Sequence, residues 1–432
     1  MLTEMSRKAY LSILEEELRP ATGCTEPIAL AYAAARMRDL LGAWPTRVRA
    51  EVSGNIIKNV KSVVVPNTGG LRGIGAAIAA GIVAGDAEKI LQVIAHAPEE
   101  QHAAIQRYAR ETPIEVVCAD SPRLLDIRLT GWLEASQGGE PSYAAVHIAD
   151  SHSCIVREEK DGRLLLERPS GSSPEDCLTD RSTLNVADIL EFANTIDPAE
   201  VAGLLDQQID CNLAIAQAGL DGNWGANIGS VLLEYDADNL QTQAKAWAAA
   251  GSDARMSGCE LPVVILSGSG NQGITASVPV VKYAGHLGVD REKLYRALLV
   301  SDLVTIEQKS GIGRLSAYCG AVSAGVGAGA GIAYLLDGSF EAIAHTIVNA
   351  VAILSGTICD GAKPSCAAKI AASVDAGILG YHMYKASQEF KSGDGIVTNC
   401  VDGTIANIGV LAKEGMRQTD RTILEIMTER CC

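Results

Sequence analysis

The run AYCGAVSAGVGAGAGIAYLL at residues 317–336 decides what kind of protein this chain forms. The run is uncharged and as long as a membrane-spanning helix. Most of it is glycine and alanine, which gain little from lipid, and it lacks an aromatic belt and basic flanks. We therefore expect a helix buried in a protein core, where small residues let neighbouring helices pack closely, and no contact with a membrane.

The overall composition is that of a large folded protein. The chain has 432 residues, of which 47% are hydrophobic and 20% are charged, enough for two or three domains. Its net charge of −16 argues against a nucleic-acid partner, which needs a basic face. The N-terminus has acidic residues and no apolar signal core, so we expect a reducing cytoplasm, in which clustered cysteines indicate metal binding or catalysis. The sequence leaves open whether the protein forms a homodimer.

Hydrophobic patterns predict an α+β fold, with a mainly helical Gly/Ala-rich domain and an inserted α+β domain that has a small mixed or antiparallel sheet. Strands are expected at residues 46–52, 114–119, 125–135 and 143–150, with a hairpin at 154–168 that turns at Asp161-Gly162. Helices are expected at residues 3–18, 25–41, 74–84, 87–96 and 99–110, and through almost all of 186–427.

The same patterns predict three segments. Residues 1–44 hold two helices that we expect to pack with the C-terminal helical domain, residues 45–180 form the α+β domain, and residues 181–432 form the helical domain that carries the cysteine site. The polar stretch at 168–180, rich in serine and proline, is the expected linker.

The turn SGSGNQG at residues 267–273 contains G-x-G-x-x-G after an apolar run. We reject a dinucleotide site, because Pro279 follows soon afterwards and no further strand pattern appears. Glycines let backbone N–H groups converge on an anion such as a carboxylate, which makes Ser267, Gly268, Asn271 and Gln272 candidate substrate contacts. A tight turn between packed elements explains the glycines equally well.

Three cysteines stand in a suggestive context. Cys319 begins the Gly/Ala-rich run, and Cys359 and Cys366 bracket the six residues DGAKPS. This spacing is wide for zinc, which prefers two to four intervening residues, whereas iron–sulfur clusters accept wider sets. A disulfide, a metal site and two unrelated buried thiols all remain open from spacing alone. Cys431 and Cys432 end the chain and receive no role.

Two further residues are candidates for proton transfer. Cys24 directly precedes Thr25, the expected N-cap of a helix, where the helix dipole and free N–H groups favour a thiolate. It is a candidate base or nucleophile, or a cysteine that fills a turn. His152, between two serines at a strand end, is a candidate proton donor or substrate contact, or a hydrogen-bonded turn histidine.

Several motifs together resemble the bacterial UPF0597 family, which is similar to the L-cysteine desulfidases and more distantly to the iron–sulfur L-serine dehydratases. The resemblance covers nearly the whole chain and rests on five motifs: TGCTEPIALAYAAA, GNIIKNVKSVVVPNTGGLRG, SGSGNQGI, YCGAVSAGVGAGAGI and TICDGAKPSCAAKI. It implies that Cys319, Cys359 and Cys366 hold one [4Fe–4S] cluster, which aerobic preparation can remove. It also implies that Cys24 is the catalytic base.

The function that the resemblance implies is a β-elimination on L-cysteine that gives hydrogen sulfide, pyruvate and ammonia without pyridoxal phosphate. Three cysteine ligands leave one iron open as a Lewis acid. The substrate carboxylate is expected at the SGSGNQG turn, with Lys309 and Lys363 as second-line anion contacts. The alternatives are an L-serine dehydratase and, from another class, a non-catalytic zinc- or redox-sensing protein.

Overall fold

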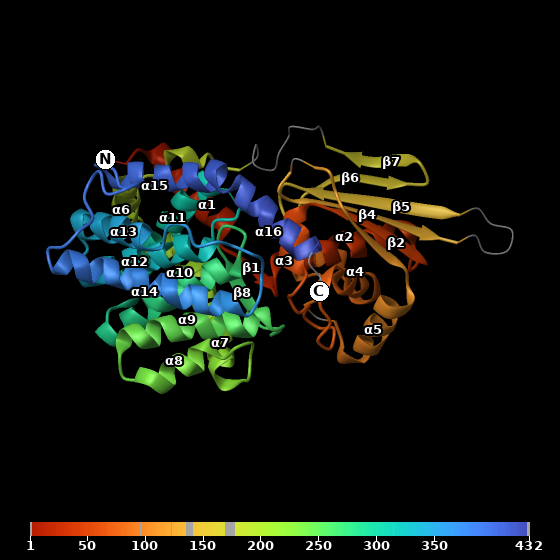
Figure 1. Cartoon of the computed structure of the whole chain (residues 1–432), viewed down its shortest axis with the longest axis horizontal. Helices are drawn as coiled ribbons and strands as arrows, with labels where there is room; N and C mark the ends of the chain where they lie inside the picture. The colour runs from red at the N-terminus through yellow and green to blue at the C-terminus, as the bar shows by residue number, and fades with distance from the viewer. Residues whose placement is uncertain are drawn as a thin grey trace.

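The computed structural model describes residues 2–95, 97–121, 123–134, 141–168, 178–313 and 315–429. Figure 1 shows two units side by side, a bundle of helices and a twisted sheet with its own helices. The described residues therefore form an α+β fold, as predicted. Cys177, Cys431, Cys432 and residues 169–176 of the expected linker lie outside the described residues.

The sheet unit is built on six strands in the order β3-β2-β4-β5-β6-β7. The β2–β3 pair is parallel and the other pairs are antiparallel, so the sheet is mixed. Asp161 and Gly162, both with positive φ, turn the β6–β7 hairpin at the predicted position. The strands are β2 (Arg47–Val52), β3 (Ile114–Cys118), β4 (Asp126–Leu133), β5 (Ser142–Ala149), β6 (Ile155–Lys160) and β7 (Arg163–Glu167).

Helices cover one face of this sheet (Figure 1). They are α2 (Thr25–Leu41), α3 (Gly54–Val60), α4 (Gly73–Ala84) and α5 (His102–Glu111). The helix expected at 87–96 is shorter than predicted, because the chain forms a 3₁₀ helix over Ala87–Gln92 with Ile90 at positive φ.

The helical unit contains α1 (Glu4–Glu17), capped by Thr3 as predicted, and the helices that follow residue 178. These are α6 (Val186–Thr195), α7 (Pro198–Asp221), α8 (Ile228–Asp236), α9 (Leu240–Met256), α10 (Gly270–Leu287), α11 (Arg291–Ile312), α12 (Gly320–Leu336), α13 (Phe340–Leu354), α14 (Ser365–Lys385), α15 (Val401–Val410) and α16 (Arg417–Glu429).

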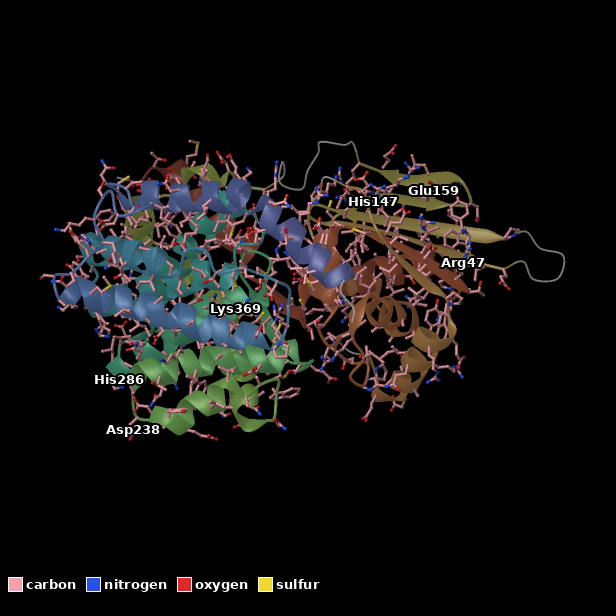
Figure 2. The ribbon with its side chains drawn as sticks, in the orientation of Figure 1. Arg47, His147, Glu159, Asp238, His286 and Lys369 are labelled. Carbon is pink, nitrogen blue, oxygen red and sulfur yellow. The ribbon has the colours of Figure 1, made fainter. Side chains whose placement is uncertain are left out.

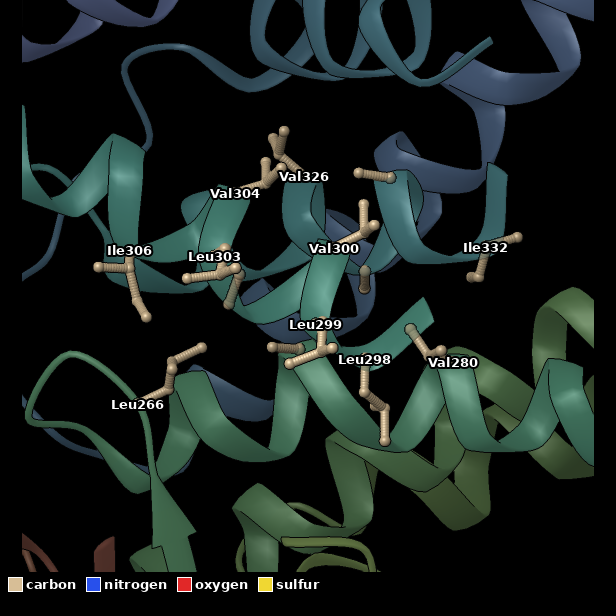
Figure 3. Close-up of a cluster of buried hydrophobic side chains, with 14 of the residues drawn as sticks. Leu266, Val280, Leu298, Leu299, Val300, Leu303, Val304, Ile306, Val326 and Ile332 are labelled. Atoms are coloured by element: carbon tan, nitrogen blue, oxygen red, sulfur yellow. The ribbon is translucent and has the colours of Figure 1, made fainter. Parts of the chain in front are cut away.

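The Gly/Ala-rich helix α12 lies in the middle of this bundle, packed against α10, α11, α13 and α14. A Cβ atom on Gly325 would lie 2.5 Å from the Ser373 backbone, and one on Gly329 would lie 2.7 Å from Gly377. The glycines therefore permit the close packing that the sequence predicted. Figure 3 shows the apolar side chains of α11 between those of α10 and α12. None of the helices in the described part of the chain has the length and apolarity that a membrane crossing requires.

Two hydrophobic clusters correct the expected grouping of the N-terminal helices. Side chains of α1 join the cluster of the helical unit, whereas those of α2 join the cluster of the sheet unit. The reason is that α2 is rich in alanine and buried on almost every side. Its small side chains let it fit between α4 and the sheet. The division of the chain into three segments otherwise stays a prediction.

The prediction of helix through almost all of residues 186–427 agrees with α6 to α16, and it did not include one strand. β8 (Pro262–Ile265) pairs antiparallel with β1 (Arg19–Thr22), a strand that the sequence analysis did not anticipate. Two consecutive valines followed by isoleucine favour this extended conformation. The pairing joins the segment before Cys24 to the segment before the SGSGNQG turn, although more than two hundred residues separate them along the chain.

Candidate active site

The two units meet at a cavity of about 100 Å³. The sheet unit contributes Cys24, Thr25, Glu26 and Asn59, and the helical unit contributes the remaining walls. This volume is below the range of about 300–1,000 Å³ typical of sites for drug-sized ligands, so the cavity suits a small molecule. Four helices, α2, α10, α12 and α14, begin at its wall. Their N-terminal N–H groups and dipoles favour negative charge there.

A short backbone pairing holds two of the predicted ligand cysteines opposite each other. Tyr318 and Ile358 form an isolated antiparallel bridge. Within it the Cys319 N–H donates to the Thr357 carbonyl at 3.0 Å, and the Cys359 N–H donates to the Ala317 carbonyl at 2.6 Å. The α12 start and the α13–α14 loop are thereby fixed to each other, and both thiols line the cavity.

The third cysteine, Cys366, lies in the first turn of α14 and lines the same cavity. The loop before it is held by Lys369, whose ammonium donates to the Ile358 carbonyl at 2.8 Å and to Asp360 at 2.6 Å. Figure 2 shows Lys369 on α14 beside the junction of the units. Gly361, with φ of +97°, approaches the Lys58 carbonyl of α3 more closely than a Cβ atom would allow. The loop is thus packed from both units.

The three thiols influence one another's pKa values electrostatically. A hydrogen bond from Cys319 lowers the pKa of Cys359 to about 5, and the Lys58 and Lys369 ammonium groups act in the same direction. The pKa of Cys319 is raised by this same hydrogen bond and by burial. Burial also raises the pKa of Cys366, and the neighbouring Cys359 contributes to the rise. The site therefore favours a thiolate at Cys359 first.

Cys24 is itself the N-cap of α2, one residue earlier than the predicted cap at Thr25. Its thiol does not cap the helix but donates to the Glu26 carboxylate, with Sγ 3.1 Å from Oε2. Burial raises the pKa of the Cys24 thiol well above its ordinary value, and the Glu26 charge raises it further. The sequence had led us to expect that the helix dipole favours a thiolate at Cys24. In the structure, burial and the Glu26 charge favour the protonated thiol instead.

Glu26 is the centre of a buried network that the sequence analysis missed. Its Oε1 accepts a hydrogen bond from Asn59 at 2.9 Å and lies 3.9 Å from His152 Nε2. Burial alone would raise the pKa of this carboxyl, but His152 and the Cys24 thiol together lower it to about 2. His152 is buried behind Glu26, and its Nε2 has no hydrogen-bond partner among the described residues.

The SGSGNQG turn contributes only part of its predicted contacts. Asn271 and Gln272, in the first turn of α10, line the cavity. Ser267 and Gly268 do not belong to its wall. Gly268 instead accepts a hydrogen bond from the Thr25 hydroxyl at 3.0 Å, which ties the turn to the start of α2. These two residues position the turn.

The arrangement of Cys319, Cys359 and Cys366 bears on which metal group these thiols could hold. All the cysteines that the structure describes are free thiols, Cys359 and Cys366 included. Within the described ranges, no three Cys, His, Asp or Glu side chains converge tightly enough to hold a single metal ion. Cys319, Cys359 and Cys366 instead surround a cavity. Three thiols that line one cavity suit a [4Fe–4S] cluster, which distributes its cysteine ligands over several irons.

Three relatives align with nearly the whole chain. A UPF0597 protein of Desulfitobacterium hafniense is 57% identical over 98% of this chain and 97% of the relative. UPF0597 proteins of Finegoldia magna and Treponema denticola are 46% and 44% identical, over 98% and 99% of this chain and 100% and 99% of the relatives. The chain belongs to the UPF0597 family. This confirms the family that the motifs indicated.

The UPF0597 chain also matches the family model described as serine dehydratase alpha chain, over residues 88–425. That range includes the three candidate ligand cysteines and His152. It does not include Cys24 or Glu26, so these two candidate residues at the start of α2 lie outside the part that the chain shares with this model.

Arg255 is a second cavity residue that sequence reasoning missed in the UPF0597 chain. It lies near the end of α9, and its Nη1 donates to Asn271 Oδ1 at 3.1 Å. No local sequence motif marks Arg255 as a site residue, because its place at the cavity depends on the turn between β8 and α10 that folds beside it. The two lysines considered earlier differ: Lys309 lines the cavity, whereas Lys363 forms an ion pair with Asp360 outside its wall.

Proposed function

We propose that this protein is a lyase of the serine dehydratase type, which catalyses β-elimination on a small amino acid with L-cysteine as substrate. The observation that carries this proposal is that Cys24 lines the same small cavity as Cys319, Cys359 and Cys366. A candidate proton acceptor and a candidate cluster site therefore face one ligand. The serine dehydratase alpha chain match over most of the chain supports the reaction class.

The proposed cofactor is a [4Fe–4S] cluster held by Cys319, Cys359 and Cys366. When bound, it supplies an iron without a cysteine ligand, a Lewis acid for the leaving group of the substrate. The backbone pairing of Tyr318 with Ile358 and the packed loop before Cys366 hold the three cysteines in place.

Glu26 Oε2, 3.1 Å from Cys24 Sγ, is the proposed acceptor of the thiol proton, and the Cys24 thiolate that this transfer leaves is the proposed acceptor of the substrate α-proton. Breaking the Cα–H and Cβ–S bonds releases sulfide and aminoacrylate. The aminoacrylate tautomerises to an imine, which water hydrolyses to pyruvate and ammonia. Pyridoxal phosphate is not required in this scheme.

L-Serine is the second candidate substrate, and the match to the serine dehydratase alpha chain family favours it. Serine differs from cysteine only in the leaving group, a hydroxyl in place of a thiol. A thiolate is the softer ligand and better suited to iron, which is why we place cysteine first. The two candidates share every contact to the carboxylate and the ammonium.

Parallel assays on protein reconstituted anaerobically with iron and sulfide test the proposal. We expect bound iron and acid-labile sulfide, and pyruvate from L-cysteine with an equal amount of hydrogen sulfide. Faster pyruvate formation from L-serine would make the protein a serine dehydratase. A colourless protein with one zinc and no turnover of either amino acid would contradict the enzyme and favour a metal- or redox-sensing role.

A further inference from the structure

Arg255 is a buried cation without a counter-ion in the described part of the chain. It is 2% exposed, and its guanidinium lines the cavity. Among the described residues, Nη1 donates a hydrogen bond to Asn271, while Nε and Nη2 are buried without a partner. Burial of an unpaired charge is costly, so a protein retains one where a ligand supplies the missing partner.

The chain makes room for this guanidinium. A Cβ atom on Gly270, the first residue of α10, would overlap Arg255 Nε. Gly270 of the SGSGNQG turn therefore provides the space that the Arg255 side chain occupies. Asn271, the next residue, orients the guanidinium through its Oδ1 atom. Asn271 is therefore placed to position the guanidinium.

Two half-buried arginines show what a structural arginine looks like in this fold. Arg181 donates to the carboxylates of Glu16 and Glu17, each at 2.7 Å. Arg36 donates to Glu158 at 2.6 Å and 3.3 Å. Both have carboxylate partners within the chain. Two guanidinium nitrogens without such a partner form a planar fork that fits a carboxylate.

In the part of the chain that the structure describes, Arg255 has hydrogen-bond donors without partners, whereas Gln272 has an acceptor without one. Its Oε1 atom is buried and has no hydrogen-bond partner among the described residues. A Cβ atom on Gly320 would lie 2.7 Å from the Gln272 amide carbon, so this glycine leaves space for the amide. The cavity thus holds an unused acceptor as well as unused donors, which matches the ammonium and the carboxylate of one amino acid.

We propose that Arg255 binds the α-carboxylate of the substrate and that Gln272 Oε1 accepts a hydrogen bond from its α-ammonium. The assignment rests on the proposed function for the identity of the substrate. It restricts the substrates to small α-amino acids, because a ligand that lacks the carboxylate leaves the arginine unpaired.

Calorimetry on the anaerobically reconstituted protein tests this with two analogues of cysteine. 3-Mercaptopropionate keeps the carboxylate and lacks the amine, whereas cysteamine keeps the amine and lacks the carboxylate. We expect Arg255→Gln to weaken 3-mercaptopropionate binding by roughly 30- to 3,000-fold and to leave cysteamine nearly unchanged. Arg255→Lys should restore part of the affinity. The iron content should equal that of the wild type.

Arg181→Gln is the matched control, because that arginine is paired inside the chain. It should lower the melting temperature and leave both affinities unchanged. If Arg255→Gln does not fold, Arg255→Lys carries the same comparison. Equal affinity of the wild type and the Arg255 variants for 3-mercaptopropionate would overturn the assignment. Tight binding that Arg255→Gln weakens, in a wild type that releases no product, would instead contradict the proposed reaction alone.

Discussion

The two walls of the cavity differ in how their polar groups are paired. On the wall from the sheet unit, Glu26 accepts hydrogen bonds from Cys24 and Asn59. On the wall from the helical unit, Arg255 and Gln272 keep buried polar atoms without hydrogen bonds in the described structure. The difference indicates two tasks. The paired wall is ready to hold and move a proton, and the unpaired wall is completed by what binds to it.

The largest effect is expected where the unpaired wall loses a ligand thiol. Cys319→Ser, Cys359→Ser and Cys366→Ser should each lose the iron and all measurable turnover, because a hydroxyl is a poor ligand for a cluster. Iron and acid-labile sulfide are measured after anaerobic reconstitution. Cys118→Ser is the control, since Cys118 is exposed on β3 and should keep both. Full iron content in all three variants would show that these cysteines do not bind the cluster.

The next effect concerns the base on the paired wall. Cys24→Ala should keep its iron and lose turnover by roughly 10²- to 10⁴-fold, the usual contribution of a positioned base. The readouts are iron content and the kcat for L-cysteine. Retention of full activity would show that the α-proton goes elsewhere. Loss of iron would show that Cys24, which belongs to the small hydrophobic cluster that Cys366 packs against, is part of the metal site.

A smaller effect is expected from Glu26→Gln. Glu26 touches Cys24 and not the ligand thiols, so iron content should be unchanged and kcat should fall by roughly 10- to 100-fold with little change in KM. Glu158→Gln is the matched control: this buried carboxylate pairs with Arg36, away from the cavity. The control should lower stability and leave kcat unchanged. A parallel loss of kcat in both variants would make Glu26 only structural.

Sequence reasoning went furthest where local patterns decide the structure. The strands at β2 to β7, the turn at Asp161-Gly162 and the cap at Thr3 follow from alternation and turn chemistry. The close packing of α12 follows from its glycines.

The remaining features depend on tertiary structure. The pairing of β1 with β8 joins two short segments that are distant in the sequence, and no local pattern encodes it. Arg255 looks like an ordinary helix-end residue until α10 folds beside it. The rise in the pKa of Cys24 comes from burial and from Glu26, and burial at a junction of two units is invisible in a helix-capping motif.

The last prediction extends the contrast in pairing to two buried carboxylates away from the cavity. Asp126 of the sheet unit accepts hydrogen bonds from His147 at 2.7 Å and from Ser121 at 2.5 Å. Burial would raise its pKa, but His147 and these hydrogen bonds lower it to about 2. Asp302 of α11 accepts only from Gln208, at 3.0 Å, and its Oδ2 is unpartnered in the described structure. Burial raises the pKa of Asp302 to about 7.

Asp302→Asn should therefore leave turnover unchanged and alter only the pH dependence of stability. Below about pH 4, Asp302 is protonated in the folded and the unfolded chain, so it contributes no slope. Between about pH 4 and 7 the unfolded chain loses this proton while the folded chain keeps it, and the free energy of unfolding of the wild type falls with rising pH. The asparagine variant lacks this loss and still accepts from Gln208. Urea denaturation at pH 5 and pH 8 should show a stability advantage of the variant that grows with pH, to about 2–4 kcal/mol. An advantage of equal size at both pH values would mean that Asp302 is ionised in the folded protein throughout this range.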